Sequence, residues 1–276
     1  MLSTKLIRLD SFLNKGLVGL HTSNRLLSTT QKWYSSTSNK KTIPTSEFNF
    51  RHLGVASDIY VPPSLKSLPN PILHPTIFFN VLIRKVYTIG LNTIQIALFR
   101  NQSGIKPNFV LWKNNAIECY VNVNTNFARN KLDKCKYNVS IWVQEALAAR
   151  AHELPKRMKL DWKLLKFNEV PKLISVQSMM IPGRPLEHIQ LVYKFNTKQR
   201  LTRVDKQTNE VKNIDKDVID HMVFVCDATS GETIMVGSVF ESSPGAKLPK
   251  NYDDNNKVTI ARMKLCGDIF RPKPSD

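Results

Sequence analysis

The stretch HIQLVYKFNTKQRLTRV, residues 188–204, decides the fold of this chain. Polar and apolar residues alternate along most of it, with Val192 as an exception among the even positions. The apolar odd positions are Ile189, Leu191, Tyr193, Phe195 and Leu201. Because successive side chains of a strand point to opposite faces, this pattern predicts a long, half-exposed β-strand. The polar residues 206–209 then predict a turn.

Other strands and helices flank this one. Apolar runs predict further strands at 161–181 (one or two strands), 218–226 and 232–241. Apolar residues spaced three or four apart predict helices at 76–101, 108–130 and 137–153, and Pro155 closes the last. The segment 252–270 fits a helix and a strand equally well. Helices followed by a meander of strands predict an α+β fold, with the helices packed on one face of a curved antiparallel sheet.

The most apolar segment is TIFFNVLIRKVYTIGLNTIQIALFRN, residues 76–101. Pro75 suits the first position of a helix, where its missing N–H costs nothing. The longest uncharged run, residues 86–99, has 14 residues, whereas a bilayer span needs about 20. Arg84 and Lys85 interrupt the upstream side. We therefore predict a buried core helix and not a membrane span, and leave open a membrane contact through another surface.

The first residues differ in composition from the rest. Residues 1–46 hold seven basic residues against one acid, Asp10, and are rich in Ser and Thr. This composition is typical of a mitochondrial transit peptide, and the alternative is a disordered basic tail that binds nucleic acid. We predict a transit peptide over 1–34, a flexible start and Pro-rich arm over 35–75, and a single α+β domain over 76–274.

The net charge is the most informative number in the sequence. Lys and Arg number 40 against 22 Asp and Glu, which gives +18 with neutral histidines. Removal of residues 1–34 would take away five bases and one acid, so +14 would remain. A charge of this size indicates an anionic partner, either nucleic acid or an acidic membrane surface.

The bases gather at the junction of the second and third predicted helices, after the third helix, and along residues 194–206. Acidic residues such as Asp215 and Asp217 come later in the chain, so the charges look segregated. Isolated lysine runs are usually only a solvated face, but segregation favours phosphate or lipid binding. The candidate contacts are Arg129, Lys131, Lys134, Lys136, Arg150, Lys156, Arg157, Lys159, Lys163, Lys166, Lys198, Arg200 and Arg203.

The sequence has no recognisable catalytic or cofactor-binding motif. GxSxG, the Walker lysine loop and GxGxxG are absent, and no CxxC pair occurs among the four cysteines. We predict no enzyme, no cofactor, no metal and no small-molecule substrate, with the cysteines and His221 as core residues. The weak alternative is a pocket lined by Asp161, Tyr193 and Asp220.

Long collinear stretches carry a resemblance to a known family. Among them are FNFRHLGVASDIYVPPSLKSLPNP, WVQEALAAR and LDWKLLKFNEVPKLISVQSMMIPGRPLEHIQLVYKFNTKQRL. Over residues 47–274 the chain resembles the fungal mitochondrial inner-membrane ribosome receptors. That resemblance implies a cone-like fold similar to the C-terminal domain of the translocase tether.

The resemblance also implies a function. A family member would be a peripheral protein on the matrix side of the inner membrane. It would hold the exit of the large mitochondrial ribosomal subunit near the Oxa-type insertase, beside anionic lipids. Two rival readings stay open. One is a constitutive large-subunit ribosomal protein near the exit tunnel, and the other is a pocket enzyme or lipid binder.

Overall fold

The computed structural model describes residues 49–64, 67–155, 157–181, 184–249 and 255–274. The described residues all belong to one compact unit, Glu47–Asp276. The predicted transit peptide and the candidate contact Lys156 lie outside the described residues.

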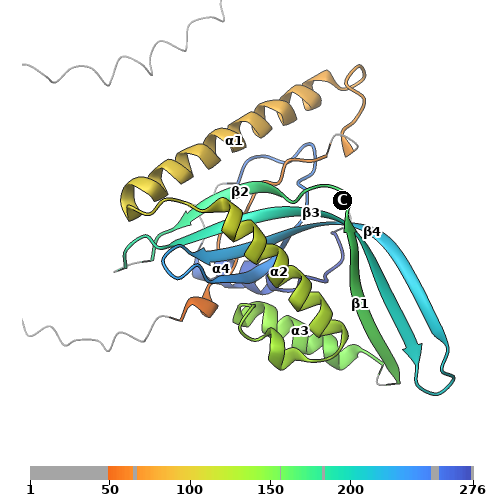
Figure 1. The fold of residues 1–276 in the computed structure, drawn as a ribbon. Coiled ribbons are helices and arrows are strands. Elements are labelled where there is room, and N and C mark those ends of the chain that lie inside the picture. Colours follow the sequence, from red (N-terminus) through yellow and green to blue (C-terminus); the bar gives the residue numbers. More distant parts are fainter. Residues whose placement is uncertain (1–48, 65–66, 156, 182–183, 250–254, 275–276) are drawn as a thin grey trace, which may run out of the picture. The chain divides into compact units, whose positions relative to one another are not determined.

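The elements follow the predicted order of helices and then strands (Figure 1). A short 3-10 helix, Phe50–His52, precedes the helices α1 (Pro75–Ser103), α2 (Phe109–Ala128) and α3 (Ile141–Glu153), with a 3-10 turn at Leu132–Cys135. The strands are β1 (Met158–Phe167), β2 (Lys172–Met179), β3 (His188–Asp205), β4 (Val211–Asp227) and β5 (Thr233–Val239), and the helix α4 (Asn256–Gly267) ends the fold. The ambiguous segment 252–270 thus forms a helix, and the α+β prediction is confirmed.

Local sequence sets the ends of the helices. Pro75 is the first residue of α1, and Gly104, at φ 69°, ends it in the left-handed conformation that glycine adopts without cost. The side chains of Asn108, Ser140 and Asn255 accept hydrogen bonds from the first turns of α2, α3 and α4. Because these caps satisfy backbone N–H groups that have no helical partner, each helix begins at its cap residue.

The strand β3 is the centre of the antiparallel sheet. Its whole length pairs with β4, from His188 opposite Asp227 to Val204 opposite Val211. On its other side β2 pairs with the first half and β1 with the second half. The strands β1 and β2 thus lie end to end along the same edge of β3. They are separated by residues 168–171, where Pro171 has no N–H to donate. The strand β5 pairs with residues 221–226 of β4, the half of β4 that lies opposite the first half of β3, and completes the sheet.

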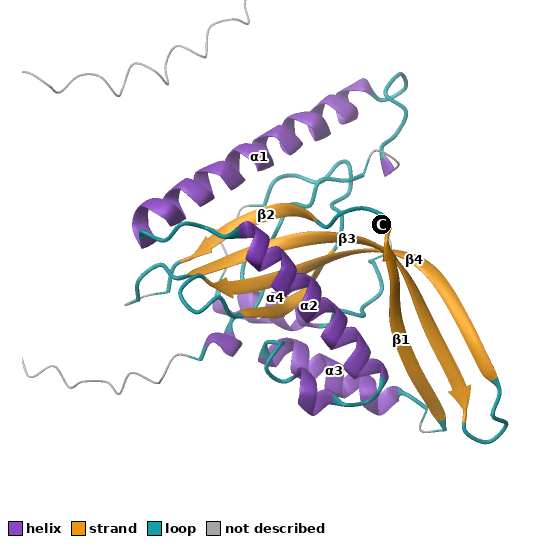
Figure 2. Cartoon of the chain, viewed as in Figure 1, coloured by secondary structure: helices purple, strands orange, loops and turns teal. Residues whose placement is uncertain are grey.

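The two faces of the sheet have different covers. Odd residues of β3, such as Leu191, Tyr193 and Phe195, pack against α2 and α3 in the main core. Val192 belongs to a second cluster on the opposite face, where Val55 and Val61 of the N-terminal arm cover the sheet. Figure 2 shows α2 crossing the front of the sheet and α4 behind it.

Because the N-terminal arm covers the second face, the prediction of a half-exposed strand holds for only part of β3. Residues 188–193 of β3 are buried on both faces, and the even residues become partly exposed only from Lys194 onward. The prediction is therefore correct for the second half of β3 and wrong for the first. The alternation could not show that the arm, more than 120 residues upstream, returns to cover the polar face there.

The prediction that α1 is a buried core helix is wrong. Its bounds agree with the sequence, but only Val81, Thr88 and Phe99 are buried. The helix lies along the outer edge of β2 (Figure 1). Asn92 donates to the carbonyl of Ile174 at 2.8 Å and accepts from the N–H of Val176 at 3.0 Å.

Gln95 continues this contact by accepting from the N–H of Ser178 at 3.1 Å. The helix therefore satisfies the free edge of a strand, which would otherwise expose unpaired backbone groups. Its apolar residues face mostly away from the sheet. No helix among the described residues is long and apolar enough to cross a membrane.

Gly237 of β5 supplies a test of the packing between the sheet and α4. A Cβ at Gly237 would lie 2.5 Å from the carbonyl oxygen of Cys266, and the backbone φ is 155°. Since backbone would have to move, we expect Gly237→Ala to lower the free energy of unfolding by about 2–3 kcal/mol. Urea denaturation measures this loss.

The matched control is Gly90→Ala in α1, where a Cβ meets nothing within 4 Å. Alanine in an exposed helix should leave the stability unchanged or raise it by up to about 1 kcal/mol. Equal stabilities of the two variants would contradict the close approach of α4 to β5.

Candidate anion-binding site

An open cleft lies where α2 and α3 end beside the second half of the sheet. Its volume is about 1320 Å³, and its walls come from the end of α2 and the residues after it, the end of α3, and the paired ends of β1 and β3. The side chains with formal positive charge are Arg129, Lys131, Lys159, Arg203 and Lys206. Asp161 is the single acid among the lining residues, and His152 also contributes. The cleft is therefore strongly basic.

Tertiary structure assembles these cations from distant parts of the chain. Arg129 is the C-cap residue of α2, and Lys131 follows it. Lys159 lies opposite Val204 in the β1–β3 ladder, and Leu160 lies opposite Arg203, so the two strands bring their cations to the same end of the sheet. The sequence placed these residues in three separate groups. Folding brings one or two members of each group into a single cleft.

Arg129 is held in place within this cleft by an ion pair. Its Nε donates to the Asp161 carboxylate at 2.9 Å, and both side chains keep part of their surface in solvent. Lys131, Lys159 and Arg203 are exposed, and the structure gives them no ion pair with any described residue. These three cations are therefore available to a dissolved or bound anion, and phosphate oxygens are suited to them.

Other predicted contacts are neutralised by acids. Arg150 of α3 makes a two-pronged hydrogen bond with Asp268, with distances of 2.5 and 2.7 Å. Arg157 lies 3.5 Å from the Asp205 carboxylate. Because a paired guanidinium gains less from a second anion, these two residues suit a structural role better than phosphate binding.

The strand β3 shows why charge segregation in the sequence was misleading. Arg200 binds Asp215 through two hydrogen bonds of 2.7 and 2.9 Å, and Lys198 lies opposite Asp217. These acids follow the cations along the chain, but the antiparallel hairpin places them side by side. The inference that the charges stay apart is therefore wrong for this strand.

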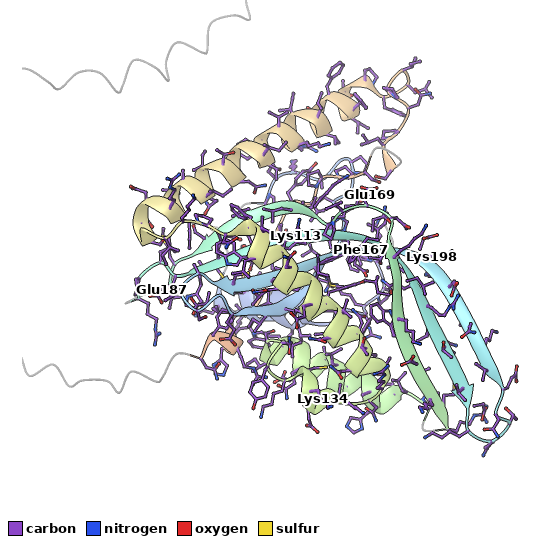
Figure 3. All side chains as sticks on the ribbon, in the orientation of Figure 1. Lys113, Lys134, Phe167, Glu169, Glu187 and Lys198 are labelled. Atoms are coloured by element: carbon purple, nitrogen blue, oxygen red, sulfur yellow. The ribbon has the colours of Figure 1, made fainter. Side chains whose placement is uncertain are left out.

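The remaining candidates lie outside the cleft. Lys163 is opposite Arg200, and Lys166 is opposite Lys198, so these residues share the face that points away from α2. Lys134 and Lys136 lie in and just after the 3-10 turn that follows α2. Figure 3 shows Lys134 beside α3 and Lys198 near β4, well apart in the view. The predicted contacts thus form several surfaces and not one.

Lys206 and His152 line the cleft but were not among the candidate contacts. Lys206 belonged to the basic group after the strand, and its proximity to Arg203 was the available signal. His152 gave no signal, because only the packing of the end of α3 beside β1 brings it to the cleft.

The alternative pocket of Asp161, Tyr193 and Asp220 does not form. Asp161 lines the cleft, but Asp220 lies in the core, where it accepts a hydrogen bond of 2.6 Å from the Tyr120 hydroxyl. Gln199 donates to the same hydroxyl at 2.7 Å. Burial raises the pKa of the Asp220 carboxyl and of the Tyr120 hydroxyl. The network satisfies polar groups that are wholly or partly buried, and none of its three residues lines the cleft.

The other titratable core residues are equally enclosed. All four cysteines are free and buried, and burial raises the pKa of Cys119 and Cys226 to about 12. Among the described residues no cluster of three His, Cys, Asp or Glu could hold a metal ion. His221 is buried as predicted, and burial lowers its pKa to about 4.

Fold and site together define a class of protein. It is an α+β domain with an open cleft lined by five cations and one acid, and all four of its cysteines are buried. A family model described as "MBA1-like protein" matches residues 38–275. The inner membrane mitoribosome receptor MBA1 of Saccharomyces cerevisiae is 56% identical over 255 residues, which cover 91% of this chain and 92% of the yeast protein.

The chain therefore belongs to the MBA1-like family. This membership confirms the resemblance found in the sequence, and it makes the chain a protein of the mitochondrial inner membrane.

The depressed pKa of His221 predicts how stability depends on pH. Below about pH 6.5 the unfolded chain binds a proton at this histidine, whereas the folded protein excludes it down to about pH 4. The free energy of unfolding should fall by up to about 3 kcal/mol across this window because of His221. Urea denaturation at pH 7 and pH 4.5 measures the effect.

The comparison that isolates the effect is His221→Gln against His52→Gln, since His52 is exposed. Between pH 7 and pH 4.5, His221→Gln should lose less free energy of unfolding than the wild type does. His52→Gln should lose as much as the wild type. Burial also lowers the pKa of His188, so the stability of both variants will keep some dependence on pH. Identical pH dependence of the wild type and His221→Gln would contradict the assignment.

Proposed function

We propose that this protein is a peripheral, matrix-side receptor of the mitochondrial inner membrane that holds the large ribosomal subunit by its RNA. The observation that carries the proposal is the cleft with five cations and one acid, in a chain 56% identical to a yeast mitoribosome receptor. Lys131, Lys159 and Arg203 would contact phosphates, because they are exposed and unpaired among the described residues. The role is binding without catalysis.

The physical task is to tether two large bodies. The ribosome would be held with its exit near the Oxa-type insertase, so that organelle-encoded membrane proteins enter the bilayer during synthesis. A weak RNA contact and a weak lipid contact on one rigid domain reinforce each other by about 10² to 10⁴ through effective concentration. The remaining net charge of +14 after loss of residues 1–34 supports both anionic partners.

The alternative, a constitutive protein of the large subunit, differs in how firmly it is held. A receptor bound through phosphates should leave the ribosome in high salt, because each neutralised phosphate steepens the salt dependence. A constitutive protein would stay at one copy per particle through a high-salt sucrose gradient. The membrane location of the yeast relative favours the receptor.

Charge reversal in the cleft tests the proposed ribosome contact. The variant Lys131→Glu, Lys159→Glu, Arg203→Glu should bind purified mitochondrial ribosomes at least about tenfold more weakly than the wild type. Its plot of log affinity against log salt should be shallower by about 2 to 3, since three phosphate contacts are lost. Co-sedimentation of the full chain with ribosomes over a range of salt measures both.

The matched control reverses three exposed lysines outside the cleft, Lys247, Lys257 and Lys264. It changes the net charge equally and should keep most of the affinity. An equal loss in both variants would show that net charge and not the cleft determines binding.

A further inference from the structure

The helix α1 is oriented opposite to an ordinary surface helix. Between the buried Val81 and Phe99, the side that faces the domain is polar: Asn92 and Gln95 bond the edge of β2, and Arg84 donates to the carbonyl of Pro244 at 3.2 Å. Thr88 is buried on the same side, one turn before Asn92. A surface helix normally turns its apolar stripe toward the core and its polar residues toward solvent. In α1 the arrangement is reversed.

The outward side of α1 carries large apolar residues. Phe79 is 60% exposed, Ile83 64%, Val86 63% and Ile94 55%, and their spacing of three, four and eight residues places them along one side. Further exposed apolar residues of the helix are Leu82, Tyr87, Ile89, Leu91 and Leu98. Soluble monomers rarely expose a continuous apolar surface of this kind, and such surfaces mark membrane or protein contacts.

The charge around this helix distinguishes the two kinds of contact. From residue 59 to residue 117 the sequence contains no Asp or Glu, although it contains six Lys or Arg. Of these, Lys85 and Arg100 are exposed on α1 itself, and Lys106 is exposed just after it. All 22 acids of the chain thus lie outside the sequence segment that contains its most apolar helix. An anionic lipid surface attracts such a segment and would repel acidic residues.

We propose that α1 lies flat in the headgroup region of an anionic bilayer, with the side of Phe79, Ile83, Val86 and Ile94 turned into the acyl boundary. The inference rests on the proposed function, because that function places the protein at the inner membrane. An interfacial helix combines an apolar side with cationic residues that reach phosphates, and it need not span the bilayer. With 29 residues, α1 would run for about 44 Å along the surface.

The hydrogen bonds to β2 give this helix a mechanical role. Asn92 and Gln95 fix it to the edge of the sheet, so a lipid contact on its outer side is transmitted to the domain that carries the basic cleft. The sheet edge needs polar side chains from α1, and the bilayer needs apolar ones. These two demands explain why the polarity of the helix is reversed.

Vesicle binding tests the proposal with the full chain. The variant Phe79→Ser, Ile83→Ser, Val86→Ser should bind phosphatidylcholine vesicles containing cardiolipin at least about tenfold more weakly than the wild type. Its matched control is Val170→Ser, Val211→Ser, Ile219→Ser, three apolar residues of similar exposure outside α1 (69%, 58% and 51%). The control should bind as the wild type does. Vesicles of phosphatidylcholine alone should bind all three proteins weakly.

A second measurement reports insertion directly. Tryptophan at position 83 (Ile83→Trp) should be quenched by brominated acyl chains, beyond the signal of the four native tryptophans in the wild type. The basic N-terminal residues are the same in all these proteins, so they cannot produce a difference between variants.

The outcomes separate this inference from the proposed function. Loss of vesicle binding by the α1 variant, with ribosome binding retained, supports a lipid contact. Unchanged vesicle binding and no quenching at position 83 would overturn it and leave the ribosome contact intact. Loss of ribosome affinity alone, or a wild-type dimer that the variant converts to a monomer, would assign α1 to a macromolecular partner and also overturn it. Failure of the wild type to bind ribosomes would refute the proposed function instead.

Discussion

The long ladder between β3 and β4 is the constraint on which the rest of the structure depends. It runs from the pair His188–Asp227 to the pair Val204–Val211, and every other strand takes its position from it. The first half is covered on both faces, by α2 and α3 on one side and the N-terminal arm on the other. The second half lacks the arm and extends past the helices, and the cleft forms where its edge meets the ends of α2 and α3.

Antiparallel pairing also decides which charges remain available. Register places Asp215 against Arg200 and Asp217 against Lys198, so part of a strand that looks basic in the sequence meets acids in the sheet. The cations of the cleft have few acidic neighbours, since Asp161 is the one acid that lines it. Their availability is a property of the tertiary structure, because it depends on which strand lies beside which.

The domain presents two surfaces of different chemistry on separate elements. The basic cleft involves the ends of α2, α3, β1 and β3, whereas the apolar side of α1 lies along β2. Since β1 and β2 both pair with β3, one after the other along it, the sheet connects the two surfaces (Figure 1). A rigid link suits a tether, because flexible connections would lower the effective concentration of the second partner.

The sequence by itself determined the class and order of the elements as far as residue 241, and left the last segment undecided between a helix and a strand. Alternation over 188–204 gave the central strand, and Pro75, Pro155 and the turn at 206–209 set boundaries to within a few residues. The spacing of apolar residues and the positions of prolines and turn residues are local properties, so they can be read directly from the sequence. Only the tertiary structure decided that the polar side of α1 faces inward, that the arm buries His188 and Gln190, and which cations share a cleft. These outcomes depend on contacts between residues far apart in the chain, and a local sequence pattern does not specify which distant segment packs against it.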